Sequence, residues 1–263
     1  MKLRRLIAVL VAGLGFASRL NAQLQPPVFN RDMVVIDPAH GGSDTGALIT
    51  DSLSEKDVTM ALASRLRSLL TARGFTVVLT RDNANATLSN DQRAELANKA
   101  HAVACLVIHA SASGNGVHIG TSTLGSSLAS IPPAGAKQSA GAIVWDRAQE
   151  IYISQSLRLA NQVGAAISRS SIPLTTERAA LRPLDNLMCP AISIEITLQG
   201  TAGSVSTPVS DSSYQQHIAD AIAGALLFWR NQAQQPEFIT VPRPSSELRP
   251  PTTFPTFRPV SGL

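Results

Sequence analysis

The chain has 263 residues, of which 44% are hydrophobic and 15% are charged. This composition supplies enough apolar side chains for a folded core and excludes an intrinsically disordered chain. The formal net charge of +4 comes from residues 1–22, which hold four basic and no acidic residues, so the remainder is neutral, with 18 residues of each sign. A neutral body has no overall field that attracts a polyanion, and we therefore expect no nucleic-acid partner.

Residues 1–22 have the pattern of a secretory signal peptide. Three basic residues precede an apolar run over residues 6–17, which is too short to span a bilayer comfortably. Ala22 offers a small residue for cleavage. We expect export to the periplasm or cell wall, with no stable membrane association after cleavage; an uncleaved membrane anchor is the alternative. No other apolar stretch is long, which excludes a multi-span membrane protein.

The two cysteines, Cys105 and Cys189, suit an exported protein without requiring a disulfide. A pair of buried thiols and a bridge are equally compatible with their positions. Their spacing matches no zinc-finger pattern.

Buried strands alternate with helices along residues 30–232. Apolar runs predict strands at 33–37, 75–80, 102–110 and 190–197. Apolar residues at helical spacing predict helices over 54–74, 89–100, from about 146 to 168, and from 211 or 212 onward. In the helix at 89–100, Leu96 and Ala97 are expected on the inner face. This alternation predicts a single domain of the α/β class, a mostly parallel twisted sheet with helices on both faces. Functional residues then gather at the carboxyl ends of the strands.

Three other segments have different compositions. Residues 111–145 are rich in Ser, Gly and Ala, so we expect a surface excursion with a strand at VHIGTST; lacking acidic residues, it should not plug a metal site. Residues 177–186 are expected to form a loop with a short strand at most. Residues 233–263 form a proline-rich tail that we expect to be extended and mobile.

Three side chains at strand ends and helix starts could bind a metal. His40 and His109 each end an apolar strand and precede small residues, which let another group approach closely. Glu55 lies in the first turn of a helix, where a carboxylate is favoured; helix capping is the alternative. A catalytic zinc site commonly takes three ligands from His and Glu and keeps one position open.

Glu195 is a charged residue inside the apolar strand at 190–197. Such a charge must be paired, neutralised or functional. A buried ion pair with an arginine such as Arg178 and a general base beside a metal site remain open as alternatives. The other histidines are less informative: His101 and His217 are expected at the surface, and His118 lies in the excursion at 111–145.

Five motifs, in order, resemble those of zinc-dependent N-acetylmuramoyl-L-alanine amidases. They are Asp37–Ala47 (DPAHGGSDTGA), Ser54–Asp57 (SEKD), Leu79–Arg81 (LTR), Ile108–Ala112 (IHASA) and Pro190–Glu195 (PAISIE). The resemblance covers about residues 32–230. The chain departs from the family pattern at Ala39, where the family has Gly, at Ser111, where it has Asn, and at 196–200, where ITLQG replaces GFLSN. These departures bear on substrate fit more than on metal binding.

The resemblance implies that His40, Glu55 and His109 bind Zn²⁺ and that Glu195 is the catalytic residue. It also implies cleavage of the amide bond between N-acetylmuramic acid and L-Ala of peptidoglycan, with Arg178 placed to bind a substrate carboxylate. We expect a monomer. The alternatives are an exported zinc hydrolase of another amide or peptide, and a catalytically inactive module that binds the cell wall.

Overall fold

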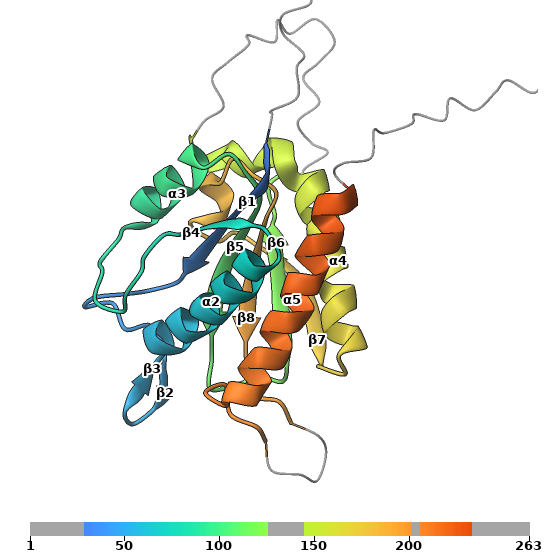
Figure 1. The fold of residues 1–263 in the computed structure, drawn as a ribbon. Helices are drawn as coiled ribbons and strands as arrows, with labels where there is room; N and C mark the ends of the chain where they lie inside the picture. The colour runs from blue at the N-terminus through green and yellow to red at the C-terminus, as the bar shows by residue number, and fades with distance from the viewer. Residues whose placement is uncertain (1–28, 126–144, 201–205, 233–263) are drawn as a thin grey trace, which may run out of the picture.

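A six-stranded sheet forms the centre of the molecule in the computed structural model, which describes residues 29–125, 145–200 and 206–232 (Figure 1). The strands are β1 (Asn30–Pro38), β4 (Thr76–Leu79), β5 (Ala102–Ala110), β6 (Val117–Ser122), β7 (Leu174–Ala179) and β8 (Ala191–Ile196). They lie in the order β4-β1-β5-β8-β6-β7, and all neighbours are parallel except β8 and β6. A short hairpin of β2 (Leu48–Thr50) and β3 (Leu53–Ser54) stands apart from this sheet.

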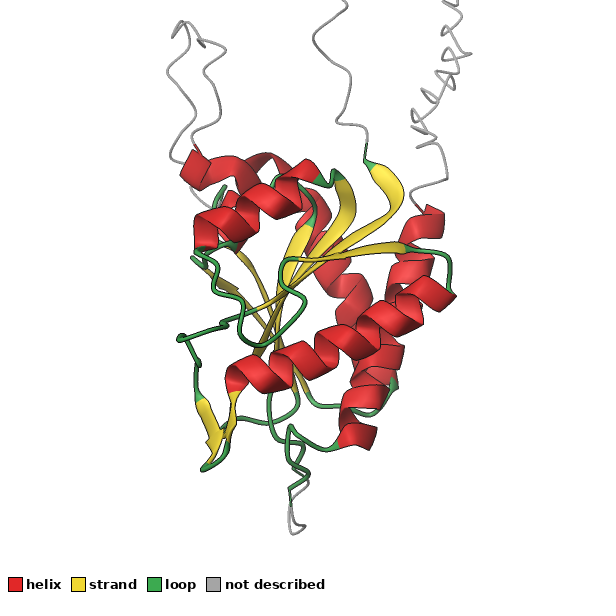
Figure 2. Ribbon diagram, turned by 60° about the vertical axis from the view of Figure 1, so that its left-hand side comes forward, coloured by secondary structure: helices red, strands yellow, loops and turns green. Residues whose placement is uncertain are grey.

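Helices cover both faces of the sheet (Figure 2). The helical elements are α2 (Glu55–Ala72), α3 (Asn90–Lys99), α4 (Ile153–Arg169), α5 (Ser212–Gln232) and the 3₁₀ segments η3 (Trp145–Tyr152) and η4 (Leu184–Asn186). One face packs against α2, α4 and α5, and the other packs against α3 and η4. The predicted fold class, a mostly parallel α/β sheet covered on both sides, is confirmed.

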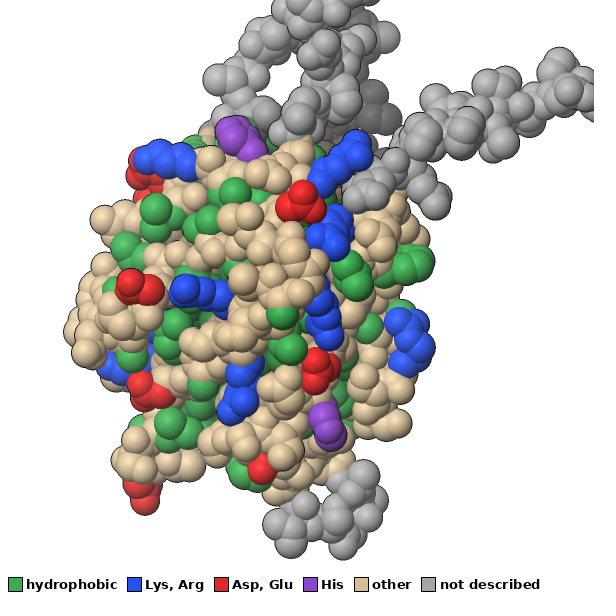
Figure 3. Space-filling view, viewed as in Figure 1, with side chains coloured by type: hydrophobic (Ala, Val, Ile, Leu, Met, Phe, Trp, Pro, Cys, Tyr) green, Lys and Arg blue, Asp and Glu red, His purple; other side chains and the backbone are tan. Residues whose placement is uncertain are grey.

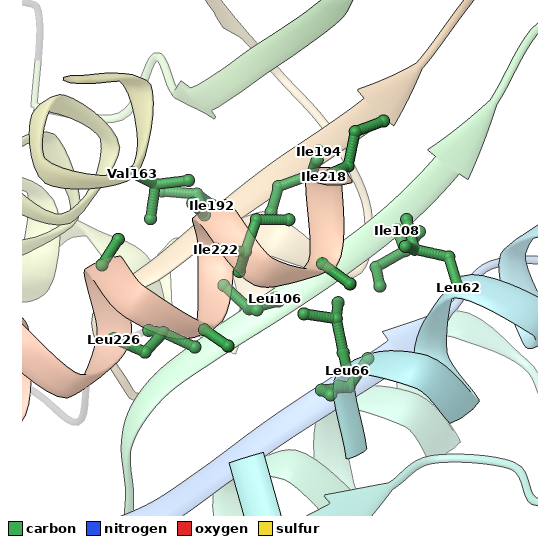
Figure 4. Packing of buried hydrophobic residues seen from close by; sticks show 14 of the residues in the cluster. Leu62, Leu66, Leu106, Ile108, Val163, Ile192, Ile194, Ile218, Ile222 and Leu226 are labelled. Atoms are coloured by element: carbon green, nitrogen blue, oxygen red, sulfur yellow. The ribbon is translucent and has the colours of Figure 1, made fainter. Parts of the chain in front are cut away.

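The larger of the two cores fixes the strands to α2, α4 and α5. Leu106 and Ile108 of β5 point to this side and meet Leu66 of α2 and Ile222 of α5 (Figure 4). The alternate residues of β5, such as Val107, point to the α3 side. Burial on both faces explains the unbroken apolar run of this strand. Burying one Leu or Ile side chain stabilises the fold by roughly 1.5–3 kcal/mol. Because this core contains many such side chains, it fixes the positions of the strands and of their ends.

Three elements differ from the sequence-based expectation. The edge strand β7 starts at Leu174, before the segment 177–186 in which a loop with at most a short strand was expected; its polar side chains give no apolar alternation, and it forms by pairing with β6. The helix expected from residue 146 begins as 3₁₀ and becomes α-helical at Ile153, because Arg147 has a non-helical φ of −126°. In α3, Leu96 was expected inside but is 40% exposed, and Arg93 and Ala94 are buried instead.

Several expectations fall on parts of the chain that the structure does not describe. They are the signal peptide at 1–22, the proline-rich tail at 233–263 and most of the excursion, residues 126–144. The strand predicted within the excursion is present as β6. Among the described helices, none combines the length and the apolar character needed to cross a membrane.

Cys105 and Cys189 form a disulfide, which resolves the two alternatives left by the sequence. The bridge joins β5 to the residue two positions before β8 and closes a sequence separation of 84 residues. Both cysteines are 1% exposed and lie in the core on the α3 side. A bridge across a long loop restricts the unfolded chain and thereby stabilises the fold.

Replacing both cysteines by alanine should lower the free energy of unfolding by up to about 4.6 kcal/mol, the loop-entropy value for a closed loop of this length. Urea unfolding monitored by circular dichroism measures the change. The oxidised wild type is the reference, and the wild type reduced before unfolding should behave like the variant. An unchanged unfolding midpoint in the double variant would show that the bridge contributes no stability.

Candidate metal centre

The ends of β1 and β5 lie near the start of α2 (Figure 1), and three side chains from these separate parts of the chain meet there. Glu55 is the first residue of α2, His40 follows β1, and His109 is the penultimate residue of β5. His40 Nε2 lies 3.1 Å from Glu55 Oε2, and His109 Nδ1 lies 2.9 Å from Glu55 Oε1. One potential ligand atom from each residue lies within 4.8 Å of the others. The structure therefore brings together the three residues proposed from the sequence as metal ligands.

Glu55 is held by the backbone as well as by the histidines. Its side chain is buried, and its two oxygens accept hydrogen bonds from the backbone N–H groups of Ala47 and Ala110, at 2.9 and 3.2 Å. Burial alone would raise the pKa of Glu55, but the bonds from His109 and these two N–H groups lower that pKa to about 2. The carboxylate is therefore ionised at neutral pH, which is the form that binds a cation. Capping of α2 is done by Ser54 and Asp57, so Glu55 is not needed for it.

A carboxylate orients His40. Both oxygens of Asp44 lie 2.9 Å from His40 Nδ1. With the proton on Nδ1 and donated to Asp44, Nε2 keeps its lone pair and faces Glu55. Burial tends to raise the pKa of Asp44, but the hydrogen bonds from His40 and from the backbone N–H of Gly46, together with nearby positive charge, outweigh this and lower it. A carboxylate behind a histidine is the usual support for a metal ligand. Asp44 lies within the motif Asp37–Ala47, but the sequence alone indicates no role for it.

Two buried arginines hold the loop that carries His40. Arg81 donates to the carbonyl oxygens of Pro38 and Ala39, at 2.8 and 3.0 Å. Arg93 donates to the carbonyl oxygen of His40 at 2.6 Å and pairs with the buried carboxylate of Asp37 at 2.7 Å. Sequence analysis noted Arg81 within a motif and missed Arg93, because an arginine on a helix is ordinarily taken to face solvent.

Gly46 leaves the space in which His40 and Glu55 meet. It has a φ of +65°, and a Cβ at this position would lie 2.6 Å from His40 Cδ2 and 2.7 Å from Glu55 Oε2. Any side chain there would displace two of the three candidate ligands. The glycine is thus required by both backbone conformation and close approach.

Glu195 lies in the strand next to His109. The parallel pairing of β5 and β8 places it directly opposite His109, and its side chain is 40% exposed. The ion pair with Arg178, one of the two alternatives left open by the sequence, is not formed; the ionisable side chain near Glu195 is His118, whose Nδ1 lies 3.6 Å from Glu195 Oε2. His118 belongs to β6, the strand that was expected within the excursion at 111–145. His101 and His217 are exposed, as predicted.

Arg178 lies on the face of the sheet that α4 covers, opposite to the face of Glu195. It borders a cavity of about 240 Å³ together with Leu157 and Ala160 of α4. Its guanidinium donates to the carbonyl oxygens of Ser122 and Leu124, at 2.9 and 3.2 Å. These bonds give Arg178 a structural role, because they hold the chain that follows β6. Its role in binding substrate stays a prediction from the resemblance.

The donor set fits a zinc ion. Two imidazole nitrogens and one ionised carboxylate are a common set for catalytic zinc, which keeps a fourth position for water or substrate. Calcium and magnesium prefer oxygen ligands alone. The partial exposure of His40 and His109 leaves the cluster open to a ligand on one side.

Comparison with known proteins gives matches over most of the chain. The family model described as N-acetylmuramoyl-L-alanine amidase matches residues 34–227. The N-acetylmuramoyl-L-alanine amidase AmiA of Salmonella typhimurium is 28% identical over 225 residues, which cover 75% of this chain and 76% of that protein.

Solved amidase structures have the same fold. The amidase AmiC2 of Nostoc punctiforme superposes with a TM-score of 0.56 at 24% identity, covering 78% of this chain and 99% of that one. The amidase Ami1 of Mycobacterium smegmatis gives a TM-score of 0.55 at 20% identity, covering 79% and 100%.

Replacing Gly46 with alanine should weaken zinc binding at least tenfold, roughly the lower bound for disturbing the groups that orient metal ligands, because the new methyl group would displace His40 and Glu55. Competition with a chelator measures the affinity. The matched control is Gly74→Ala: Gly74 also has a positive φ, of +82°, but a Cβ there would meet nothing closer than 3.7 Å. Equal zinc affinities in the two variants would contradict the steric role of Gly46.

Proposed function

This chain belongs to the N-acetylmuramoyl-L-alanine amidase family, and from this we propose that it is a zinc-dependent peptidoglycan hydrolase. The bond cleaved is the amide between the lactyl group of N-acetylmuramic acid and L-Ala of the stem peptide. The observation that carries the proposal is the convergence of His40, Glu55 and His109 beside a strand that holds a further acidic side chain, Glu195.

His40, Glu55 and His109 are assigned as the zinc ligands. His40 would bind through Nε2, because Asp44 occupies its Nδ1, and His109 would bind through Nδ1, the atom that faces Glu55. When bound, zinc polarises the substrate carbonyl and makes water more acidic. The backbone bonds to Glu55 hold that ligand in place before any metal arrives.

Glu195 is assigned as the general base and acid. It takes a proton from the attacking water as the new C–O bond forms, and gives it to the amide nitrogen as the C–N bond breaks. The products are a lactyl carboxylate and a stem peptide with a free N-terminal amine. Partial exposure suits this role, because the carboxylate must reach both water and substrate.

The site of action follows from the expected signal at 1–22, and we place the mature protein in the periplasm or cell wall. The buried disulfide supports this location, because such bridges persist in oxidising compartments. Acidic and basic side chains are interspersed on the face shown in Figure 3, so this face has no basic patch of the kind that binds a nucleic acid.

Alanine at His40 or at His109 should remove both the zinc and the activity, since two remaining ligands cannot hold the ion. Zinc content by mass spectrometry and release of stem peptides from purified peptidoglycan are the measurements. His217→Ala, which changes an exposed histidine on α5, is the control and should keep both. A double variant of His40 and His109 with full zinc content would disprove the ligand assignment.

Glu195→Gln should retain zinc and lose about two to four orders of magnitude in turnover, the usual contribution of general acid–base catalysis. Glu95→Gln, which changes an exposed glutamate on α3, is the matched control. Mass analysis of the products identifies the bond that is cut: a free amine on L-Ala supports the proposal, and cleavage within the peptide would assign the chain to a different amide.

A further inference from the structure

His118 lies beside Glu195 on the neighbouring strand. The antiparallel pairing of β6 and β8 sets His118 opposite Glu195, and the pairing of β5 and β8 sets His109 opposite it on the other side. Side chains at paired positions project from the same face of a sheet. The three therefore form one row, with the carboxylate between two imidazoles.

The two side chains have each other as their polar partners. His118 Nδ1 lies 3.6 Å from Glu195 Oε2. Over residues 29–125, 145–200 and 206–232, neither side chain has another hydrogen bond or ion pair. His118 is consequently the group best placed to set the direction of this carboxylate.

We propose that His118 is a positioning residue for Glu195, a role that rests on the function proposed for Glu195. With its proton on Nδ1, the imidazole holds Oε2 and leaves Oε1 free to take the proton of the attacking water. An unrestrained, partly exposed glutamate samples several rotamers, and only some of them reach that proton. The distance of 3.6 Å exceeds a hydrogen bond; catalytic hydrogen bonds are often long without substrate and shorten when it binds.

The contact between His118 and Glu195 is not explained by a contribution to the free energy of unfolding. Both side chains are partly exposed, and ion pairs of this kind contribute little to folding. The strands are held by their backbone pairing and by the core on the α2, α4 and α5 side. Variants of His118 should therefore fold normally, so a loss of activity can be attributed to the site.

The test compares kcat, KM and zinc content in a set of variants on a soluble peptidoglycan fragment. His118→Leu should lower kcat by about tenfold to a hundredfold, the range for residues that orient a functional group, with KM and zinc content unchanged. His118→Asn keeps an N–H donor and should recover most of kcat. His217→Leu is the matched control on an exposed histidine and should match the wild type.

A double-variant cycle decides whether His118 acts through Glu195. In the Glu195→Gln background, His118→Leu should change kcat by less than about twofold, because residues acting as a unit are not additive. If the loss of kcat in the double variant equals the product of the two single losses, His118 does not act through Glu195 and this proposal fails. Normal kcat in His118→Leu, with Glu195→Gln inactive, would also overturn this proposal alone. Normal kcat in Glu195→Gln would overturn the role of Glu195 and this proposal with it.

Discussion

The candidate metal centre depends on two buried arginines that bind backbone carbonyl groups. The loop after β1 has left the sheet, so its carbonyl oxygens have no strand to pair with, and unpaired buried carbonyls are costly. Arg81 and Arg93 supply the missing donors to Pro38, Ala39 and His40. The planar guanidinium, with five donors in a fixed arrangement, suits several carbonyls at once. The loop is thereby held with His40 at a φ of +62°, and the other contacts of the cluster follow from that conformation.

This arrangement places two cations where water is largely excluded. Burial, together with the charge of Arg93, lowers the pKa of Arg81 below its ordinary value. The neighbouring anion is Asp37, which pairs with Arg93 and accepts a bond from Thr80. Removing one partner of a buried pair typically costs about 3–5 kcal/mol. The extensive core on the opposite side of the sheet stabilises the domain and offsets the free-energy cost of burying these charges. The site therefore depends on the stability of the rest of the domain.

The fold and the candidate ligands were predictable because they leave local signals. Continuous apolar runs and helical spacing define the strands and helices, and His40, Glu55 and His109 stand at their ends. Features that depend on long-range pairing left no such signal. The position of His118 beside Glu195 arises from the insertion of β6 between β8 and β7, which local sequence does not encode. The need for glycine at 46 arises from two side chains approaching it from other elements, and the burial of Arg93 from carbonyls on a loop far away in sequence.

The disulfide has a consequence for the alignment of β5 and β8. A slip of one residue between these strands would turn Glu195 to the opposite face and bring an isoleucine, Ile194 or Ile196, beside His109. Cys105 and Cys189 are joined at the other end of the same two strands. The covalent link excludes such misaligned pairings, and it does so without contacting the row that it protects. The bridge therefore fixes the alignment of the two strands from within the core on the α3 side.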